Sequence, residues 1–254
     1  MKSLRVNKFR IQRFLLHCLF ILLFCCLAFS KVFPFNIPER LVYDLTWTGI
    51  KAGEAVLEVK EDGNHLLIIS TAKSAKWVSV FYTVDDWVQS KVLWSDTNPF
   101  LHSTNYRLKI REGRHRKDKE VVFDAHNSKA IYIDYLSNER REIDTPFPIF
   151  DPLSSFYYLR GMHLEVGKPV YVTIFDSKKV WNVEVQVLRK EKIEVPAGEF
   201  DTIVIKPLMK SEGIFYRKGD ILIWLTDDEK RIPVKLQTKV KIGSINANLT
   251  GGQF

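Results

Sequence analysis

The chain has 254 residues, of which 46% are hydrophobic, and its formal net charge is +8. Five of its 38 basic residues lie in the first 13 positions, so loss of that segment would leave a net charge of only about +3. So small a charge does not favour nucleic acid as a partner. All three cysteines lie before residue 27, which excludes a disulfide framework, a cysteine nucleophile and a thiolate metal site from the rest of the chain.

The first 30 residues have the pattern of a secretory signal peptide. A basic stretch without acids precedes an apolar run from Phe14 to Ser30, which ends in Ala28-Phe29-Ser30. We expect cleavage after Ser30 and a periplasmic location for the mature protein. An apolar run of about 17 residues is also near the lower limit for a membrane-spanning helix, so an uncleaved N-terminal membrane anchor is the alternative.

After residue 40, apolar and polar residues alternate, which is the pattern of half-buried β-strands. In RLVYDLTWT, for example, the alternation places Leu41, Tyr43 and Leu45 on one face. Comparable segments recur to the C-terminus without a glycine- or serine-rich linker. We therefore expect residues 31–254 to form a single all-β domain. Its fold would be one strongly curved antiparallel sheet, or a partly open barrel, of roughly a dozen strands.

A basic hairpin is predicted for residues 103–124, with its turn around Gly113. Three cations of its first strand alternate with apolar residues and so share one face. Four more follow the turn: Arg114, Arg116, Lys117 and Lys119. One interpretation is a solvated face with cross-strand ion pairs. The other is a patch that binds an anionic membrane surface or lipid headgroup. The candidate anion patch comprises Arg107, Lys109, Arg111, Arg114 and Arg116.

One segment has a helical period instead. Asp151 suits the N-cap, Pro152 suits the first helical position and Gly161 lies just past the end, so a helix is predicted over about residues 151–160. A helix of about ten residues is too short to be stable alone and must pack on the sheet. Residues 74–82 are a second candidate helix.

Aromatic residues are concentrated in and just before the predicted helix. They would either close one end of the barrel as ordinary core or form a lid over an apolar cavity. The sequence leaves both interpretations open. The candidate lid residues are Phe147, Phe150, Phe156, Tyr157 and Tyr158.

Two later segments are predicted to be turns. Pro196 and Gly198 interrupt two strand-like runs, so we expect a hairpin connection with Gly198 at positive φ. The consecutive acids Asp227, Asp228 and Glu229 lie between two further strand-like runs. Short acidic side chains bond to nearby backbone amides in turns, whereas a metal site would need more ligands than this run supplies. We therefore predict a bend there.

The sequence contains no recognisable catalytic or metal-binding motif. The five histidines after residue 30 lack the short spacings of a local metal site. Ser154 and Ser155 lack the flanking glycines of a nucleophile elbow. Asp85 and Asp86 would point to opposite faces of a strand and could not act as a pair. We therefore expect a protein without catalytic residues, metal or cofactor.

Five segments, taken together and in order, resemble a family of exported bacterial proteins known as domain of unknown function 3108. They are ERLVYDLTWTGIKAGEAVLEV, IREGRHRKDKEVVFD, DPLSSFYYLR, VPAGEFDTIVIKP and GIFYRKGDILIWLTDDEKRIPVKLQTKVKIGSINANL. The resemblance covers almost all of residues 39–249. It implies a signal-bearing envelope protein rich in β-structure, and it carries over no catalytic residue. A looser, fold-level similarity is to periplasmic lipoprotein carriers, in which a curved antiparallel sheet surrounds a helix-lidded apolar cavity.

The leading hypothesis is thus a non-enzymatic periplasmic protein whose curved sheet binds an apolar or amphipathic envelope molecule, either a lipid or a lipoprotein. The alternative is a structural or assembly factor of the cell envelope with a filled core, which acts through surface contacts with another protein. An empty apolar cavity beneath residues 147–158 would favour the first hypothesis. Several acids or histidines converging in one cleft would instead favour an envelope hydrolase.

Overall fold

The computed structural model describes residues 33–95, 98–208, 221–239 and 243–254. They belong to one compact unit, Phe33–Phe254. The predicted signal peptide, residues 1–30, lies outside the described residues. Within the described ranges, no helix is long and apolar enough to span a membrane.

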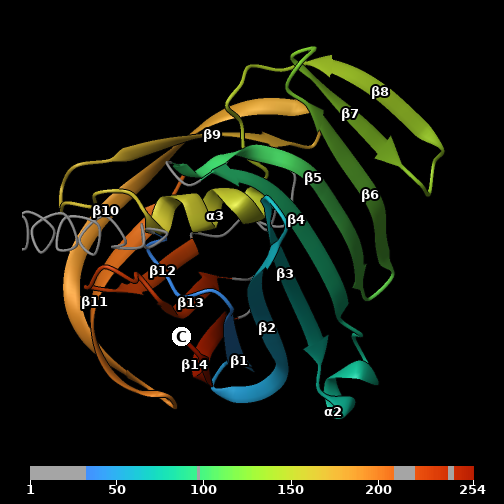
Figure 1. Ribbon diagram of the computed structural model, residues 1–254. Coiled ribbons are helices and arrows are strands. Elements are labelled where there is room, and N and C mark those ends of the chain that lie inside the picture. The colour runs from blue at the N-terminus through green and yellow to red at the C-terminus, as the bar shows by residue number, and fades with distance from the viewer. Residues whose placement is uncertain (1–32, 96–97, 209–220, 240–242) are drawn as a thin grey trace, which may run out of the picture. The chain divides into compact units, whose positions relative to one another are not determined.

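The described strands form a single antiparallel sheet of 14 strands, which is strongly curved (Figure 1). The strands are β1 (Glu39–Trp47), β2 (Ile50–Asp62), β3 (His65–Ser74), β4 (Asp85–Ser95), β5 (Asn98–Glu112), β6 (His115–Asp124), β7 (Lys129–Asp134), β8 (Glu139–Asp144), β9 (Val170–Asp176), β10 (Lys179–Val195), β11 (Gly198–Pro207), β12 (Ile221–Thr226), β13 (Pro233–Lys239) and β14 (Ser244–Gln253). The predicted all-β fold is confirmed. The sheet does not close into a barrel, because β8 and β9 are its two edges.

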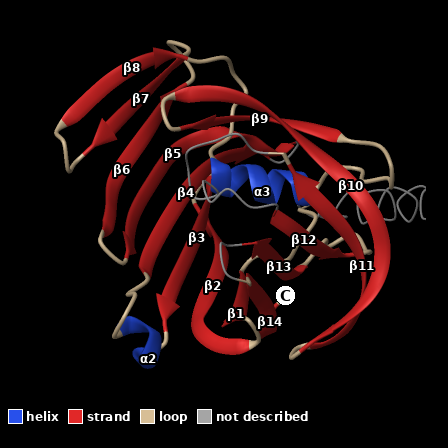
Figure 2. Cartoon of the chain, turned by 180° about the vertical axis from the view of Figure 1, so that it is seen from behind, coloured by secondary structure: helices blue, strands red, loops and turns tan. Residues whose placement is uncertain are grey.

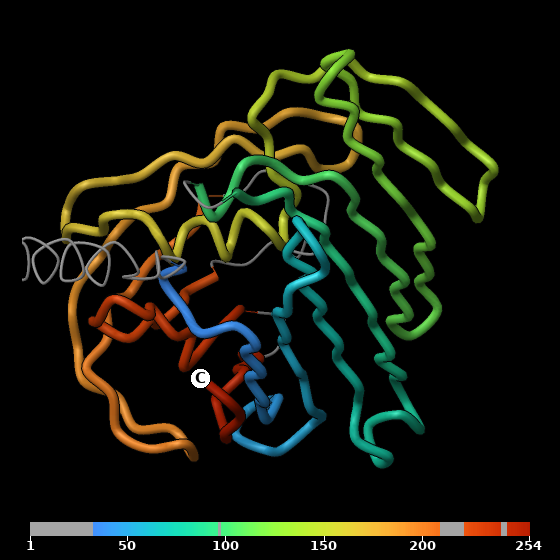
Figure 3. Tube along the Cα trace, viewed as in Figure 1, coloured from blue at the N-terminus to red at the C-terminus, as the bar shows by residue number. Residues whose placement is uncertain are grey.

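The first and last strands pair in the middle of the sheet. β1 is hydrogen-bonded to β2 on one side and to β14 on the other. Strands β1 to β8 follow one another toward one edge, and β14 back to β9 follow one another toward the other edge. Figure 3 shows the blue start and the red end of the described chain side by side at this seam. Consequently β8 and β9, which are consecutive in the chain, lie at opposite edges.

The connection from β8 to β9 crosses the concave side of the sheet and contains helix α3 (Pro152–Arg160), which the curved strands surround in Figure 2. Before the helix, the backbone N–H of Ser103 on β5 donates to the carbonyl of Ile149 at 3.0 Å. The N–H of Phe175 on β9 donates to the carbonyl of Phe150 at 2.8 Å. Residues 149–150 therefore attach the connection both to β5 and to the edge strand β9.

The predicted start of the helix is confirmed, with Asp151 as the N-cap. One carboxylate oxygen accepts from two backbone N–H groups of the first turn, at 2.9 Å each. The other accepts from the hydroxyls of Ser90, Ser103 and Ser154 at 2.6, 2.7 and 2.8 Å. Burial outweighs these hydrogen bonds and raises the pKa of Asp151. Since Ser90 lies on β4 and Ser103 on β5, this carboxylate attaches the helix to two strands.

A buried ion pair fixes the other end of α3. Both terminal nitrogens of Arg160 donate to the carboxylate of Glu39 on β1 at 2.7 Å each. One of them also donates to the carbonyl of Lys230 at 3.0 Å. The guanidinium carbon lies 4.6 Å from the ring centre of Phe35 and 5.0 Å from that of Tyr157. The pair therefore ties helix, central strand and N-terminal segment together inside the core.

The predicted turns are confirmed, and the second candidate helix is shorter than expected. β10 and β11 form a hairpin in which Gly198 has φ of +133°. The acidic run joins β12 to β13, where Asp228 accepts from the backbone N–H groups of Lys230 and Arg231 at 3.0 Å each. Within residues 74–82, only α2 (Lys76–Ser79) is helical.

Candidate functional site

The concave side of the sheet contains an apolar cavity of about 310 Å³ beside the start of α3. Its walls come from β1 to β5, from β12 to β14, and from Pro152, Leu153 and Phe156 of the helix. Small side chains leave this space open. Ala55 on β2 pairs directly with Ala72 on β3, and both line the cavity, as does a third alanine on β14. We call this space the apolar cavity.

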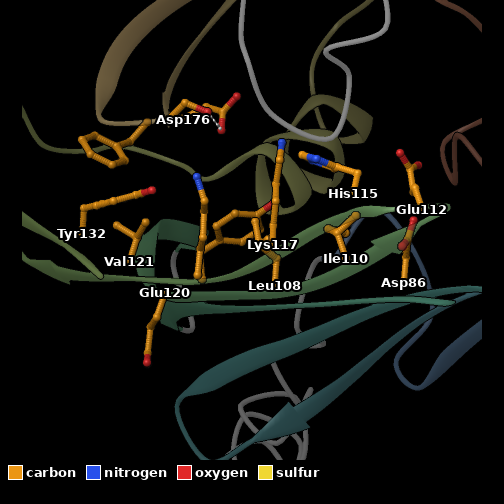
Figure 4. A pocket seen from close by; sticks show the side chains of 14 residues that line it. Asp86, Leu108, Ile110, Glu112, His115, Lys117, Glu120, Val121, Tyr132 and Asp176 are labelled. Atoms are coloured by element: carbon orange, nitrogen blue, oxygen red, sulfur yellow. Dashed lines mark hydrogen bonds between the residues drawn. The ribbon is translucent and has the colours of Figure 1, made fainter. Parts of the chain in front are cut away.

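A second cavity, of about 300 Å³, adjoins the first, because Asp86 and Ile110 line both. Figure 4 shows ionisable side chains around it, with Lys117 and His115 on the same side of the sheet and Asp176 at the far end. The side chain of Glu120 points away from this space. We call this second space the charged cavity. The two cavities together give the concave side one apolar and one polar region.

The wall of the charged cavity includes a buried tyrosine hydroxyl without a partner. The side chain of Tyr106 is 3% exposed, and no hydrogen-bonding group of the described residues reaches its hydroxyl. Burial raises the pKa of Tyr106 well above its ordinary value, so the hydroxyl keeps its proton at neutral pH. An unsatisfied buried group of this kind costs about 1–3 kcal/mol.

Lysines supply positive charge to the same cavity. The ammonium of Lys119 lies 3.5 Å from Asp134 and 5.3 Å from the ring centre of Tyr132. Burial alone would lower the pKa of Lys119, but the Tyr132 hydroxyl and the Asp134 carboxylate outweigh burial and raise it. Lys117, two residues before Lys119 on β6, lines the same wall. The site therefore combines the cationic groups of Lys117 and Lys119 with the carboxylates of Asp86, Glu112 and Asp176.

The five predicted lid residues divide between the core and the cavity wall. Tyr157 and Phe150 are buried, at 0% and 5% exposure. Phe150 stacks on Tyr158 with ring centres 4.4 Å apart, and Phe147 packs edge-on against a ring of β5. Among these five, Phe156 is the one that lines the apolar cavity. The aromatic cluster thus holds the helix in place, and Phe156 faces the empty space.

The predicted anion patch lies on the opposite, convex face of the sheet. Its strand residues alternate with Leu108 and Ile110, which line the charged cavity. Arg107 forms an ion pair with Asp118 and lies 4.4 Å from the ring centre of Tyr135. Arg107 therefore fits the interpretation of a solvated face with cross-strand ion pairs. The remaining four members are exposed: Lys109, Arg111, Arg114 and Arg116.

Our sequence reasoning missed the charged cavity. A signal was present, because Lys117 and Lys119 are in phase with Val121 and Phe123, which are buried core residues. No such pattern predicts that Asp176 lines the charged cavity, because β9 comes near β6 only through the curvature of the sheet and the connection around α3. Among the described residues, no three histidine, cysteine, aspartate or glutamate side chains are grouped as a metal site would require.

Comparison with solved structures shows a similar fold in a β-barrel-like protein of domain of unknown function DUF1849 from Brucella abortus. The two are 13% identical with a TM-score of 0.55, over 86% of this chain and 98% of that one. At this identity the likeness concerns the fold alone.

Two further structures match with a TM-score of 0.34 and 12% identity each. One is a protein from Bacteroides fragilis with a YmcC-like fold, proposed to be exported, and the match covers 89% of this chain and 100% of that one. The other is a proposed lipoprotein from Parabacteroides distasonis, with 88% and 100% covered.

No curated protein matches the chain significantly. A sequence model described as "protein of unknown function (DUF3108)" matches residues 42–250, a range that contains the lining of both cavities. The resemblance seen in the sequence is thereby confirmed. The chain belongs to the DUF3108 family.

Proposed function

We propose that this protein is a non-enzymatic binding protein of the bacterial cell envelope that holds an amphipathic molecule on the concave side of its sheet. The observation that carries the proposal is the junction of an apolar and a charged cavity at Asp86 and Ile110. Ligand sites are typically concave, mostly apolar and furnished with a few well-placed polar groups. Each of the two cavities matches the lower end of the usual range, about 300–1,000 Å³.

The two cavities suit the two ends of such a ligand. A hydrocarbon chain would lie against Phe156 and the alanines of β2 and β3, where burial of each CH₂ group contributes about 0.8 kcal/mol. A headgroup oxygen would accept a hydrogen bond from the ammonium of Lys119, whose side chain is 25% exposed. Charge-assisted hydrogen bonds of the lysine kind are about twice as strong as neutral ones. The ligand class is therefore a lipid, or a lipid-bearing protein, with a polar headgroup.

The buried serine cluster supports a binding role over a hydrolytic one. Ser103 and Ser154 both donate to Asp151, and all three side chains have 0% exposure. This cluster caps α3 and lines neither the apolar cavity nor the charged cavity. A serine nucleophile would need access to its substrate, which this cluster does not have. The envelope location in the proposal rests on the signal pattern of residues 1–30.

Native mass spectrometry of protein purified from its own envelope tests the proposal. We expect the parent to carry a lipid-sized adduct, because the apolar cavity is open. A double variant, Ala72→Trp with Ala247→Trp, places two indoles in that cavity and should lose the adduct while remaining folded. A matched control, Ala125→Trp in the β6–β7 turn, leaves the cavity free and should keep it. A folded parent without any adduct would favour the alternative, a filled-core assembly factor.

A further inference from the structure

Exposed apolar side chains gather at one end of the sheet, around α2 and the turn between β1 and β2. Phe81 is 87% exposed and Val80 is 75% exposed, and both directly follow the helix. The indole N–H of Trp77 donates to the carbonyl of Lys51 at 3.1 Å, which holds α2 against the start of β2. We call this surface the aromatic rim; it comprises Trp47, Ile50, Trp77, Val80, Phe81 and Tyr82. Concentrated exposed apolar surface of this kind marks an interaction site.

Unpaired cations border the aromatic rim. The ring of Tyr82 lies against Gly113, where a Cβ atom would come within 2.6 Å of it, and the N–H of Gly113 donates to the carbonyl of Thr83. The β5–β6 turn and its cations therefore lie beside the segment that follows α2. We call these cations, with the lysine of α2, the basic border: Lys76, Lys109, Arg111, Arg114 and Arg116. Within the described ranges, none of the five forms an ion pair with a carboxylate.

We propose that the aromatic rim and the basic border together form a docking surface for an anionic lipid bilayer. Tryptophan and tyrosine rings favour the interface between lipid and water, and each lysine or arginine near an anionic membrane adds about a factor of five in affinity. Val80 and Phe81, at the tip of the rim, would enter the boundary between headgroups and acyl chains. The surface thus matches an anionic bilayer in both of its properties, negative charge and apolar interior.

The docking surface lies near residues that line the apolar cavity. Ala72 and Asp86 line the apolar cavity and lie shortly before and after the α2 segment in the chain. At the lower end of the sheet in Figure 1, α2 lies next to the strands that carry these two residues. A docked protein would therefore present the α2 end of the apolar cavity to the bilayer. Docking itself does not require the proposed ligand, so the two proposals can fail separately.

Vesicle flotation tests the docking surface. We expect the purified protein, residues 31–254, to float with vesicles of phosphatidylglycerol and phosphatidylethanolamine, and much less with neutral phosphatidylcholine vesicles. Salt should weaken the binding, because the Debye length is only about 8 Å at physiological ionic strength. The variant Arg111→Gln with Arg114→Gln should lower the partition coefficient by about 30-fold. The variant Val80→Ser with Phe81→Ser should lower it by at least about tenfold.

Matched controls carry the same changes elsewhere. Lys60→Gln with Arg140→Gln removes two other exposed cations, and Leu136→Ser with Val166→Ser removes two other exposed apolar side chains. Both should bind vesicles like the parent, and so should the variant Ala72→Trp with Ala247→Trp, in which the apolar cavity is filled. Equal binding to neutral and anionic vesicles would overturn the proposal. The proposal would also be overturned if the rim and border variants still bound vesicles, or if the controls lost binding to the same extent. Binding to other proteins without any binding to vesicles would overturn it as well.

Discussion

The buried ion pair at the end of α3 gives a sharp prediction, because its two side chains are 0% and 1% exposed. Replacing Arg160→Met would remove two charge-assisted hydrogen bonds of 2.7 Å and leave the carboxylate of Glu39 inside the core. Removing one partner of a buried pair typically costs about 3–5 kcal/mol, chiefly because the remaining charge is unpaired. We expect a loss of unfolding free energy in that range. The double variant Arg160→Met with Glu39→Leu should recover most of it, because no buried charge remains.

Urea unfolding followed by tryptophan fluorescence measures these differences as shifts of the transition midpoint. The control is Arg141→Met, since Arg141 pairs with Glu139 but its side chain is 63% exposed. An exposed pair contributes about 0–1 kcal/mol, so the control should unfold almost like the parent. A stabilising role of the buried pair would be refuted if Arg160→Met lowered the free energy of unfolding no more than the control does. It would also be refuted if the double variant were as unstable as the single one.

Two further predictions concern backbone conformation and pH. Gly198→Val should lower the free energy of unfolding by at least about 1 kcal/mol, because valine is strained at a φ of +133°; a melting temperature equal to that of Ala197→Val, the neighbouring change, would contradict this. Asp151→Asn should reveal the raised pKa of Asp151. A carboxyl whose pKa is higher in the folded state stabilises the fold when protonated, and this contribution is lost as pH rises above its ordinary 3.8. The stability of the parent relative to Asp151→Asn, measured in urea between pH 3.5 and 7, should therefore fall with rising pH, and a flat or rising difference would contradict the assignment.

Local features of the fold could be predicted from the sequence because they depend on neighbouring residues. The alternation in RLVYDLTWT places Leu41 and Tyr43 in the core, at 0% and 3% exposure. Asp151 and Pro152 mark the start of α3, and the acids around Asp228 mark a turn. In the last two cases the backbone hydrogen bonds that mark the feature join residues within three positions of one another. Such patterns are visible without knowledge of the tertiary structure.

The candidate site depended on contacts that no local pattern contains. The two cavities meet at Asp86 and Ile110, and they exist because β1 pairs with β14 and the connection through α3 leaves space along the strands. The predicted anion patch lies on the outer face of β5 and in the β5–β6 turn, whereas Lys117 and Lys119 face the cavity. The lid prediction named Phe156 among five aromatics without distinguishing it from the core. Which side chain faces an empty space is a property of packing.

Site-specific photo-crosslinking would show whether an amphipathic molecule binds in the apolar cavity. p-Benzoylphenylalanine in place of Phe156 would put a reactive group in the wall of the apolar cavity. The same group in place of Leu136, an exposed position in the β7–β8 turn, serves as the control. After irradiation of living cells, we expect the mass of a lipid, or of a lipid-bearing protein, added to the protein labelled at position 156, and none to the control. Labelling at position 156 that captured only protein without lipid, or nothing, would contradict binding of an amphipathic molecule in the cavity.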